Sequence, residues 1–335
     1  MLERLWSRIK AFVAGLFRRK PPPPGRFESD KKAAFRGLLT TAPWVWPSRE
    51  FLIYVPQGHT NWRKRALLVL IHGCHQTPED FAAGTRVTAL ADSLGCLVLL
   101  PRQDRRANSW GCWNWFDQAT AHGWGETAIV AAQVHAVHSR FRIDSRRVFV
   151  AGMSSGGALA SALGVRRPDL VAGVFVHSGI GCGAASSPLS ATQVLRTGAD
   201  QDIMQIARDI REKTAIDALP VPLVAIQGSN DTVVPPIHAA QLVRQYLVLN
   251  GHPHADAEPN DAIPPPDRTM STVLPDDRVV TTSEWRIGDR MAARHVLVDG
   301  LGHAWSGGDA NYPYNDSHAP DATALLQAFM AEALR

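Results

Sequence analysis

Short apolar runs that end in glycine or proline alternate along this chain with segments of helical spacing. The run ALLVLIHG (66–73) is apolar up to its last two residues, which is typical of a strand buried on both faces of a sheet. Because strands and helices alternate, the sequence predicts an α/β fold with a mostly parallel central sheet and helices on both faces. The predicted strands are 51–56, 66–73, 96–101, 147–152, 171–179, 222–228 and 294–300, and the predicted helices are 85–95, 125–141, 156–168, 238–251 and 321–334.

The first 20 residues differ from the rest of the chain in charge. They carry six basic side chains and Glu3, a balance of +5, whereas the whole chain has a formal net charge of +4, so the remainder is near neutral. Their apolar residues follow a helical stripe, which predicts a basic amphipathic helix suited to a membrane or polymer-granule surface. The alternatives are a helix packed on the body or a frayed tail. Basic charge confined to this segment argues against nucleic acid as a partner.

The organisation expected is a helix at 1–20, a proline-rich linker at 21–34 and a single catalytic domain at 35–335. The N-terminal segment does not match a secretory signal, because its apolar centre is short and no small-residue cleavage site follows it. We therefore expect a cytoplasmic protein, or one peripheral on a membrane or granule. A polar, proline-rich stretch at 252–282 is expected to run irregularly over the surface.

The stretch VFVAGMSSGGALA (148–160) combines a predicted strand, a glycine-flanked turn and the start of a helix. The turn matches G-x-S-x-G, in which the glycines permit a sharp bend that leaves the central serine exposed above the sheet. Ser154 is therefore the candidate nucleophile, with an ordinary structural turn as the alternative.

A serine nucleophile needs a base, and the base needs an acid that orients it. In this architecture the chain order is serine, acid, histidine. Asp231 follows the predicted strand 222–228 and His303 follows the strand 294–300, so these two residues are the candidate acid and base. Asp299 is a rival acid because it lies close to His303 in the sequence.

The tetrahedral intermediate of acyl transfer also needs two N–H donors. The backbone N–H groups of Ser155, directly after the nucleophile, and of Cys74, in the loop IHGCHQT, are the candidates. The four cysteines are too few and too widely spaced for a disulfide scaffold, and because they include no C-x-x-C pair, no structural zinc site is expected.

Aromatic residues near these motifs are candidates for the walls of a substrate pocket. Trp305 lies two residues after the candidate base, and Trp113 and Trp115 belong to the motif GCWNWF (111–116). His75, next to the oxyanion candidate, is a further candidate. The alternative is that most of these side chains belong to the core.

With these residues in place, the chain resembles the polyhydroxybutyrate depolymerase esterases of the α/β-hydrolase superfamily. The resemblance covers about residues 50–332 and is carried by IHGCHQTPEDFA (71–82), GCWNWF (111–116), RVFVAGMSSGGALA (147–160), NDTVVP (230–235) and GLGHAWSGG (300–308).

The resemblance implies an α/β-hydrolase fold and a triad of Ser154, Asp231 and His303. It further implies hydrolysis of carboxylic esters, often short-chain polyhydroxyalkanoates, with no metal or organic cofactor. It suggests that Cys74 and Cys112 lie close together and form a disulfide, with a reduced pair as the alternative. Extracellular location is implied by the family but not by the N-terminal segment.

Two other interpretations of the function stay open. One is an esterase of the feruloyl or acetyl-xylan type, or a general short-chain carboxylesterase, because acyl and alcohol specificity depends on loops such as 183–220 and 252–282, from which the sequence discriminates poorly. The other, of a different class, is a surface-binding protein that is anchored by residues 1–20 and has little activity.

Overall fold

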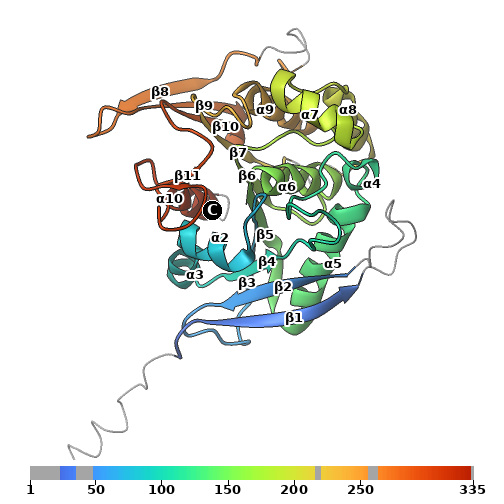
Figure 1. Cartoon of the computed structure of the whole chain (residues 1–335), viewed down its shortest axis with the longest axis vertical. Coiled ribbons are helices and arrows are strands. Elements are labelled where there is room, and N and C mark those ends of the chain that lie inside the picture. Colours follow the sequence, from blue (N-terminus) through green and yellow to red (C-terminus); the bar gives the residue numbers. More distant parts are fainter. Residues whose placement is uncertain (1–22, 35–47, 216–219, 256–262, 333–335) are drawn as a thin grey trace, which may run out of the picture.

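The computed structural model describes residues 23–34, 48–215, 220–255 and 263–332 (Figure 1). Within these residues a ten-stranded sheet has the order β1-β2-β4-β3-β5-β6-β7-β10-β9-β8. The six strands from β4 to β10 in this order are parallel to one another, and two antiparallel strands extend the sheet at each edge. The strands are β1 (Arg26–Ala34), β2 (Ser48–Val55), β3 (Arg65–Ile71), β4 (Leu97–Pro101), β5 (Ile143–Met153), β6 (Gly173–His177), β7 (Leu223–Gly228), β8 (Arg268–Val273), β9 (Val279–Ile287) and β10 (Arg290–Val298).

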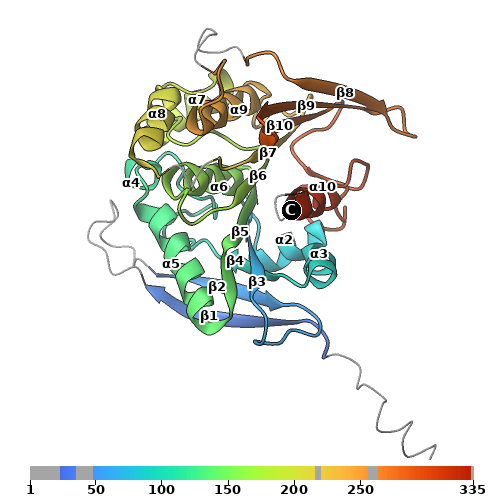
Figure 2. The ribbon, with the colours of Figure 1, turned by 180° about the vertical axis from the view of Figure 1, so that it is seen from behind.

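Helices cover both faces of this sheet (Figures 1 and 2). On one side lie α2 (Pro78–Thr85), α3 (Val87–Leu94) and α10 (Ala322–Glu332). On the other side lie α4 (Gln118–Ala121), α5 (Gly125–Arg140), α6 (Ser155–Arg166), α7 (Pro188–Thr197), α8 (Ile203–Lys213) and α9 (Ile237–Asn250). A small separate sheet pairs β11 (Trp305–Ser306) with β12 (Asn315–Asp316).

The central strands are apolar on both faces because each face has its own core. In β3, Leu67 and Val69 pack into the core beneath α5, α6 and α9, whereas Leu68 and Leu70 pack into the core beneath α2, α3 and α10. Successive side chains of a strand point to opposite faces, so a doubly covered strand needs a continuous apolar run. The predicted α/β fold with helices on both faces is confirmed.

Two regions differ from the sequence prediction. Residues 26–34 were expected in the linker, but they form β1, which pairs antiparallel with β2. Within the expected irregular stretch at 252–282, β8 and part of β9 form an antiparallel pair that extends the other edge of the sheet. Edge strands take part through backbone hydrogen bonds and can be polar, as in RFESDKKAA and RTMSTV, so neither shows the apolar run used to find strands.

The predicted helix at 1–20 lies outside the described residues. Among the helices that the structure describes, none combines the length and the apolar character required to cross a bilayer.

Candidate active site

Ser154 lies at the turn between β5 and α6, at the carboxyl end of the central strand. Its backbone has φ 56° and ψ −125°, a conformation that L-residues rarely adopt. The flanking glycines make this turn possible because the backbone at both positions lies too close to other backbone atoms for a Cβ atom to fit. A Cβ atom at Gly152 would collide with the backbone oxygen of Gly156, and one at Gly156 would collide with the backbone oxygens of Ile71 and His72. The local sequence therefore forces a strained elbow with Ser154 at its tip.

His303 and Asp231 come together at the same edge of the sheet. The Nδ1 atom of His303 lies 2.8 Å from Oδ2 of Asp231, while Oδ1 of Asp231 accepts the N–H groups of Val233 at 3.0 Å and Val234 at 2.8 Å. Burial by itself would raise the pKa of Asp231, but the hydrogen bond and the charge of His303, with smaller effects of the Val234 N–H and the Ser178 hydroxyl, lower it below its usual 3.8. Asp231 is therefore an ionised, fully engaged carboxylate beside the imidazole.

Among the hydrogen bonds of the described residues, none joins the rival acid, Asp299, to the imidazole of His303. Its Oδ1 atom accepts a hydrogen bond of 2.8 Å from the Ser229 hydroxyl instead. The side chain of Asp299 is at the surface, whereas Asp231 is 3% exposed. The geometry thus favours Asp231.

Ser154 and His303 both line one pocket of about 800 Å³. Its walls are mostly apolar and come from the loop after β3, the loop after β4, α7 and the C-terminal loops. Apart from Ser154 and His303, the lining residues are Gly73, Cys74, His75, Gln76, Ala107, Asn108, Ser109, Trp110, Cys112, Asn114, Trp115, Phe116, Met153, Pro188, Ala191, Thr192, Leu195, Val233 and Tyr314.

Of the four predicted substrate-binding residues, His75 and Trp115 line this pocket. The predictions for Trp113 and Trp305 are wrong, because both side chains are fully buried away from it. The indole N–H of Trp113 donates to the backbone oxygen of His72 at 3.0 Å. Trp305 packs in the core beneath α10, where its indole N–H donates to Thr323 at 3.1 Å. Nearness to His303 in the sequence did not show that the Trp305 side chain points into the core and not into the pocket.

Sequence reasoning missed several lining residues. α7 supplies Pro188, Ala191, Thr192 and Leu195. The helix start was readable from Ser187 followed by Pro188, since Ser187 forms a capping box with Ser190. Which face of α7 meets the pocket depends on long-range packing and has no local signal. Tyr314 was missed because it lies in a loop without a motif.

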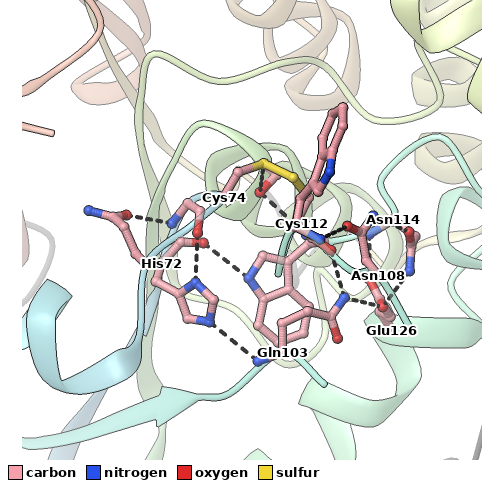
Figure 3. The surroundings of a disulfide bond; sticks show 12 residues. His72, Cys74, Gln103, Asn108, Cys112, Asn114 and Glu126 are labelled. Carbon is pink, nitrogen blue, oxygen red and sulfur yellow. Dashed lines mark hydrogen bonds between the residues drawn. A yellow bond between two sulfur atoms is a disulfide. The ribbon is translucent and has the colours of Figure 1, made fainter. Parts of the chain in front are cut away.

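The loop that carries the oxyanion candidate Cys74 is held by several contacts (Figure 3). A disulfide joins Cys74 to Cys112, with 4.1 Å between their Cα atoms. The N–H of Gly73 donates to Oε1 of Gln76 at 2.8 Å, and the N–H of His75 donates to the backbone oxygen of Trp110 at 2.9 Å. Among the described residues, the backbone N–H groups of Cys74 and Ser155 have no intramolecular acceptor. Neither N–H group is therefore used by a hydrogen bond of the described part of the fold.

A buried carboxylate supports the other end of this disulfide (Figure 3). Glu126 accepts the backbone N–H of Asn114 at 2.6 Å and the side-chain amide of Gln103 at 2.5 Å, and Arg49 lies 3.7 Å away. Gln103 also donates to the backbone oxygen of Cys112 at 2.8 Å. Burial raises the pKa of Glu126 despite these partners. The loop 107–116 is thus held in place by the buried polar network around Glu126.

The described residues contain no group of three histidine, cysteine, aspartate or glutamate side chains arranged to hold a metal ion. The chemistry available at this site is that of a hydroxyl, an imidazole, a carboxylate and backbone N–H donors.

Comparison with known proteins finds a depolymerase and an esterase among the relatives of this chain. The chain is 29% identical over 198 residues to a poly(3-hydroxybutyrate) depolymerase of Ralstonia pickettii, covering 53% of this chain and 39% of that protein. It is 31% identical over 152 residues to feruloyl esterase B of Neurospora crassa, covering 43% of this chain and 50% of that protein. The chain therefore spans half or less of the length of these two relatives.

The fold is similar to that of the acetyl xylan esterase from Aspergillus awamori, with a TM-score of 0.64 and 21% sequence identity over 83% of this chain and 94% of the other. A family model described as "Esterase PHB depolymerase" matches residues 49–260, which is more than half of the chain. The match contains the elbow at Ser154, the loop that carries Cys74, and Asp231. The chain thus belongs to the PHB depolymerase family of esterases, within the α/β-hydrolase fold.

Proposed function

We propose that this protein is a serine esterase that hydrolyses carboxylic esters through an acyl-enzyme. The observation that carries the proposal is the shared pocket: Ser154 on its strained elbow and His303, paired with Asp231, line the same apolar cavity. A serine hydroxyl is a weak nucleophile at neutral pH and reacts only when a base accepts its proton.

In the proposed mechanism, Oγ of Ser154 attacks the ester carbonyl while Nε2 of His303 accepts the hydroxyl proton. Asp231 accepts the Nδ1–H of His303 and stabilises the imidazolium that forms. The N–H groups of Cys74 and Ser155 stabilise the oxyanion. The alcohol leaves with the proton from His303, and water then repeats the sequence on the acyl-enzyme to release the acid.

We propose short-chain polyhydroxyalkanoates, as polymer or oligomers of 3-hydroxybutyrate, as the substrate class. Three exposed apolar side chains surround the pocket: Trp110 is 67% exposed, Val233 51% and Tyr314 40%. Such a rim suits an ester chain that continues beyond the reacting bond, because apolar surface at the mouth gains contact with the next repeating unit. The relative from Ralstonia pickettii carries the name of a depolymerase of this polymer.

The test is hydrolysis by the full chain and by Ser154→Ala of p-nitrophenyl esters of increasing acyl length, 3-hydroxybutyrate oligomers, a polyhydroxybutyrate suspension, feruloyl esters and acetylated xylan. We expect cleavage of oligomers or polymer that the variant loses. Cleavage confined to feruloyl or acetyl-xylan substrates would keep the esterase and replace the substrate class. A folded wild type without activity on any ester would overturn both.

We further propose that residues 1–20 form a helix that attaches a single catalytic domain to a membrane or granule surface. The support is the apolar stripe and the +5 charge balance of this segment. The chain without residues 1–20 should lose binding to anionic vesicles or polymer granules and keep hydrolysis of soluble esters. Loss of hydrolysis together with attachment would contradict this division of roles.

A further inference from the structure

The strand β6 lies between the strand of the nucleophile, β5, and the strand that precedes the acid, β7. At its carboxyl end are His177 and Ser178, both fully buried. The backbone oxygen of His177 accepts the N–H of Ser154 at 3.1 Å, and the N–H of Ser178 donates to the backbone oxygen of Ile226 at 2.9 Å. These two residues therefore lie directly beneath the candidate triad of Ser154, Asp231 and His303, whose catalytic role rests on the proposed function.

The side chains of these residues form a series of contacts that leads to the proposed acid. The N–H of Ser306 lies 3.2 Å from Nε2 of His177, and Nδ1 of His177 lies 3.1 Å from Oγ of Ser178. The Ser178 hydroxyl is near enough to Asp231 to lower the pKa of its carboxyl group. Asp231 in turn accepts from His303. The series thus runs from the backbone of β11 to the proposed catalytic base.

The donors and acceptors present determine which atom donates in each of these contacts. A backbone N–H can only donate, so Nε2 of His177 must be the unprotonated nitrogen. Burial, with a smaller effect of His303, lowers the pKa of His177 to about 3, so the ring is neutral and carries its single proton on Nδ1. That proton is donated to Oγ of Ser178. The one hydrogen of Ser178 is then left for Asp231, which as a carboxylate can only accept.

We propose that His177 and Ser178 are positioning residues for the triad: His177 fixes the Ser178 hydroxyl as a donor to Asp231, and this holds the carboxylate toward His303. Trp305 contributes by stacking on the His177 ring, with 5.2 Å between ring centroids and 28° between planes. Trp305, which does not line the substrate pocket, thus has a role in orienting His177.

The backbone at Ser178 offers a sharp test. Its φ of 50° is in the left-handed region, where a residue with a side chain is strained and glycine is not. Ser178→Gly therefore removes the hydroxyl while it relieves strain. We expect little change in melting temperature but a kcat lower by roughly ten- to a hundredfold, the worth of one hydrogen bond to a charged group, with KM little changed.

The matched control is Ser161→Ala in α6. Its hydroxyl is also fully buried and, among the described residues, has no hydrogen-bond partner. We expect wild-type kcat from this variant. A wild-type kcat in Ser178→Gly, or an equal loss in Ser161→Ala, would overturn the proposal.

Two variants of His177 separate its two hydrogen bonds. In His177→Asn the amide nitrogen can replace Nδ1 as a donor to Ser178, whereas in His177→Gln the amide oxygen can replace Nε2 as an acceptor from Ser306. The proposal predicts that Asn retains more of the wild-type kcat than Gln. The reverse order would mean that the ring acts only by holding β11.

A readout that does not need activity is the tautomer of His177, measured by long-range ¹H–¹⁵N correlation and assigned by loss of the signal in His177→Asn. The proposal requires the proton on Nδ1, and a proton on Nε2 would overturn it. If the wild type hydrolyses no ester but His177 has the Nδ1–H tautomer, the proposed function fails while the series of contacts stands.

Discussion

The Nδ1 atom of His303 lies 2.8 Å from Oδ2 of Asp231, although 72 positions separate the two residues in the chain. The contact arises because β7 and β10 are parallel neighbours, so the loops after them leave the sheet at the same edge. Ser154 follows β5 at that edge. The candidate triad is therefore a product of strand order as much as of its own side chains.

Asp231→Asn should leave the fold intact and lower kcat by roughly three to four orders of magnitude, because an amide favours the wrong imidazole tautomer and cannot stabilise the imidazolium. The measurement is steady-state hydrolysis of p-nitrophenyl butyrate at neutral pH. Asp299→Asn is the matched control and should keep wild-type kinetics, since Asp299 bonds Ser229 instead. Large loss of activity in the control with retention in Asp231→Asn would make Asp299 the acid.

Loss of the disulfide should lower both stability and activity. The bridge closes a loop with a sequence separation of 38, so its removal should lower the free energy of unfolding by roughly 3–4 kcal/mol. Activity should fall because Cys74 supplies an N–H of the proposed oxyanion hole. The measurement is thermal unfolding and kcat with and without dithiothreitol. The double variant Cys74→Ser/Cys112→Ser should not respond to the reductant, and a wild type equally indifferent would contradict the prediction.

Trp110→Ala should raise KM for oligomeric or long-chain esters and leave the p-nitrophenyl acetate kinetics nearly unchanged. An aromatic contact contributes about 0.5–1.5 kcal/mol, which predicts an increase of a few-fold to about tenfold. Stability should not change, because the side chain is 67% exposed. Trp62→Ala removes a tryptophan that is 87% exposed and does not line the pocket, so it is the control. Equal effects of the two variants would indicate non-specific adsorption.

The free energy of unfolding should decrease as the pH falls from about 6.5 toward 4. Burial lowers the pKa of His72 to about 4, so the unfolded chain binds a proton in this range and the folded protein does not. The decrease should level off for this group below its folded pKa. His72→Gln should be less stable at neutral pH but should show a shallower pH dependence of the unfolding free energy. An unchanged slope in the variant would contradict the contribution of His72.

The sequence predicted those parts of the fold that depend on local pattern. Doubly buried strands such as β3 and β4 carry continuous apolar runs, and the elbow at Ser154 is fixed by its flanking glycines. The edge strands β1 and β8 were missed because a strand that is paired on one side only can be polar. Register and strand order depend on contacts between distant segments and leave no local trace.

The same division holds for the site. Ser154, Asp231 and His303 each follow an apolar strand, so sequence position and architecture together predicted that they lie at the same edge of the sheet. Trp305 was misplaced because closeness to His303 in the sequence does not fix the direction of its ring, which packs in the core. The pocket face of α7 was missed because helical spacing shows an apolar stripe but not what the stripe contacts.

The central claim is that Ser154 is the nucleophile, and its most direct test is covalent trapping. The full chain is incubated with a fluorophosphonate, and the adduct is located by peptide mass spectrometry, with Ser154→Ala in parallel. The account predicts one adduct on Ser154, loss of esterase activity in proportion to labelling, and no labelling of the variant. A folded wild type that stays unlabelled, or an adduct that persists in Ser154→Ala, would contradict it.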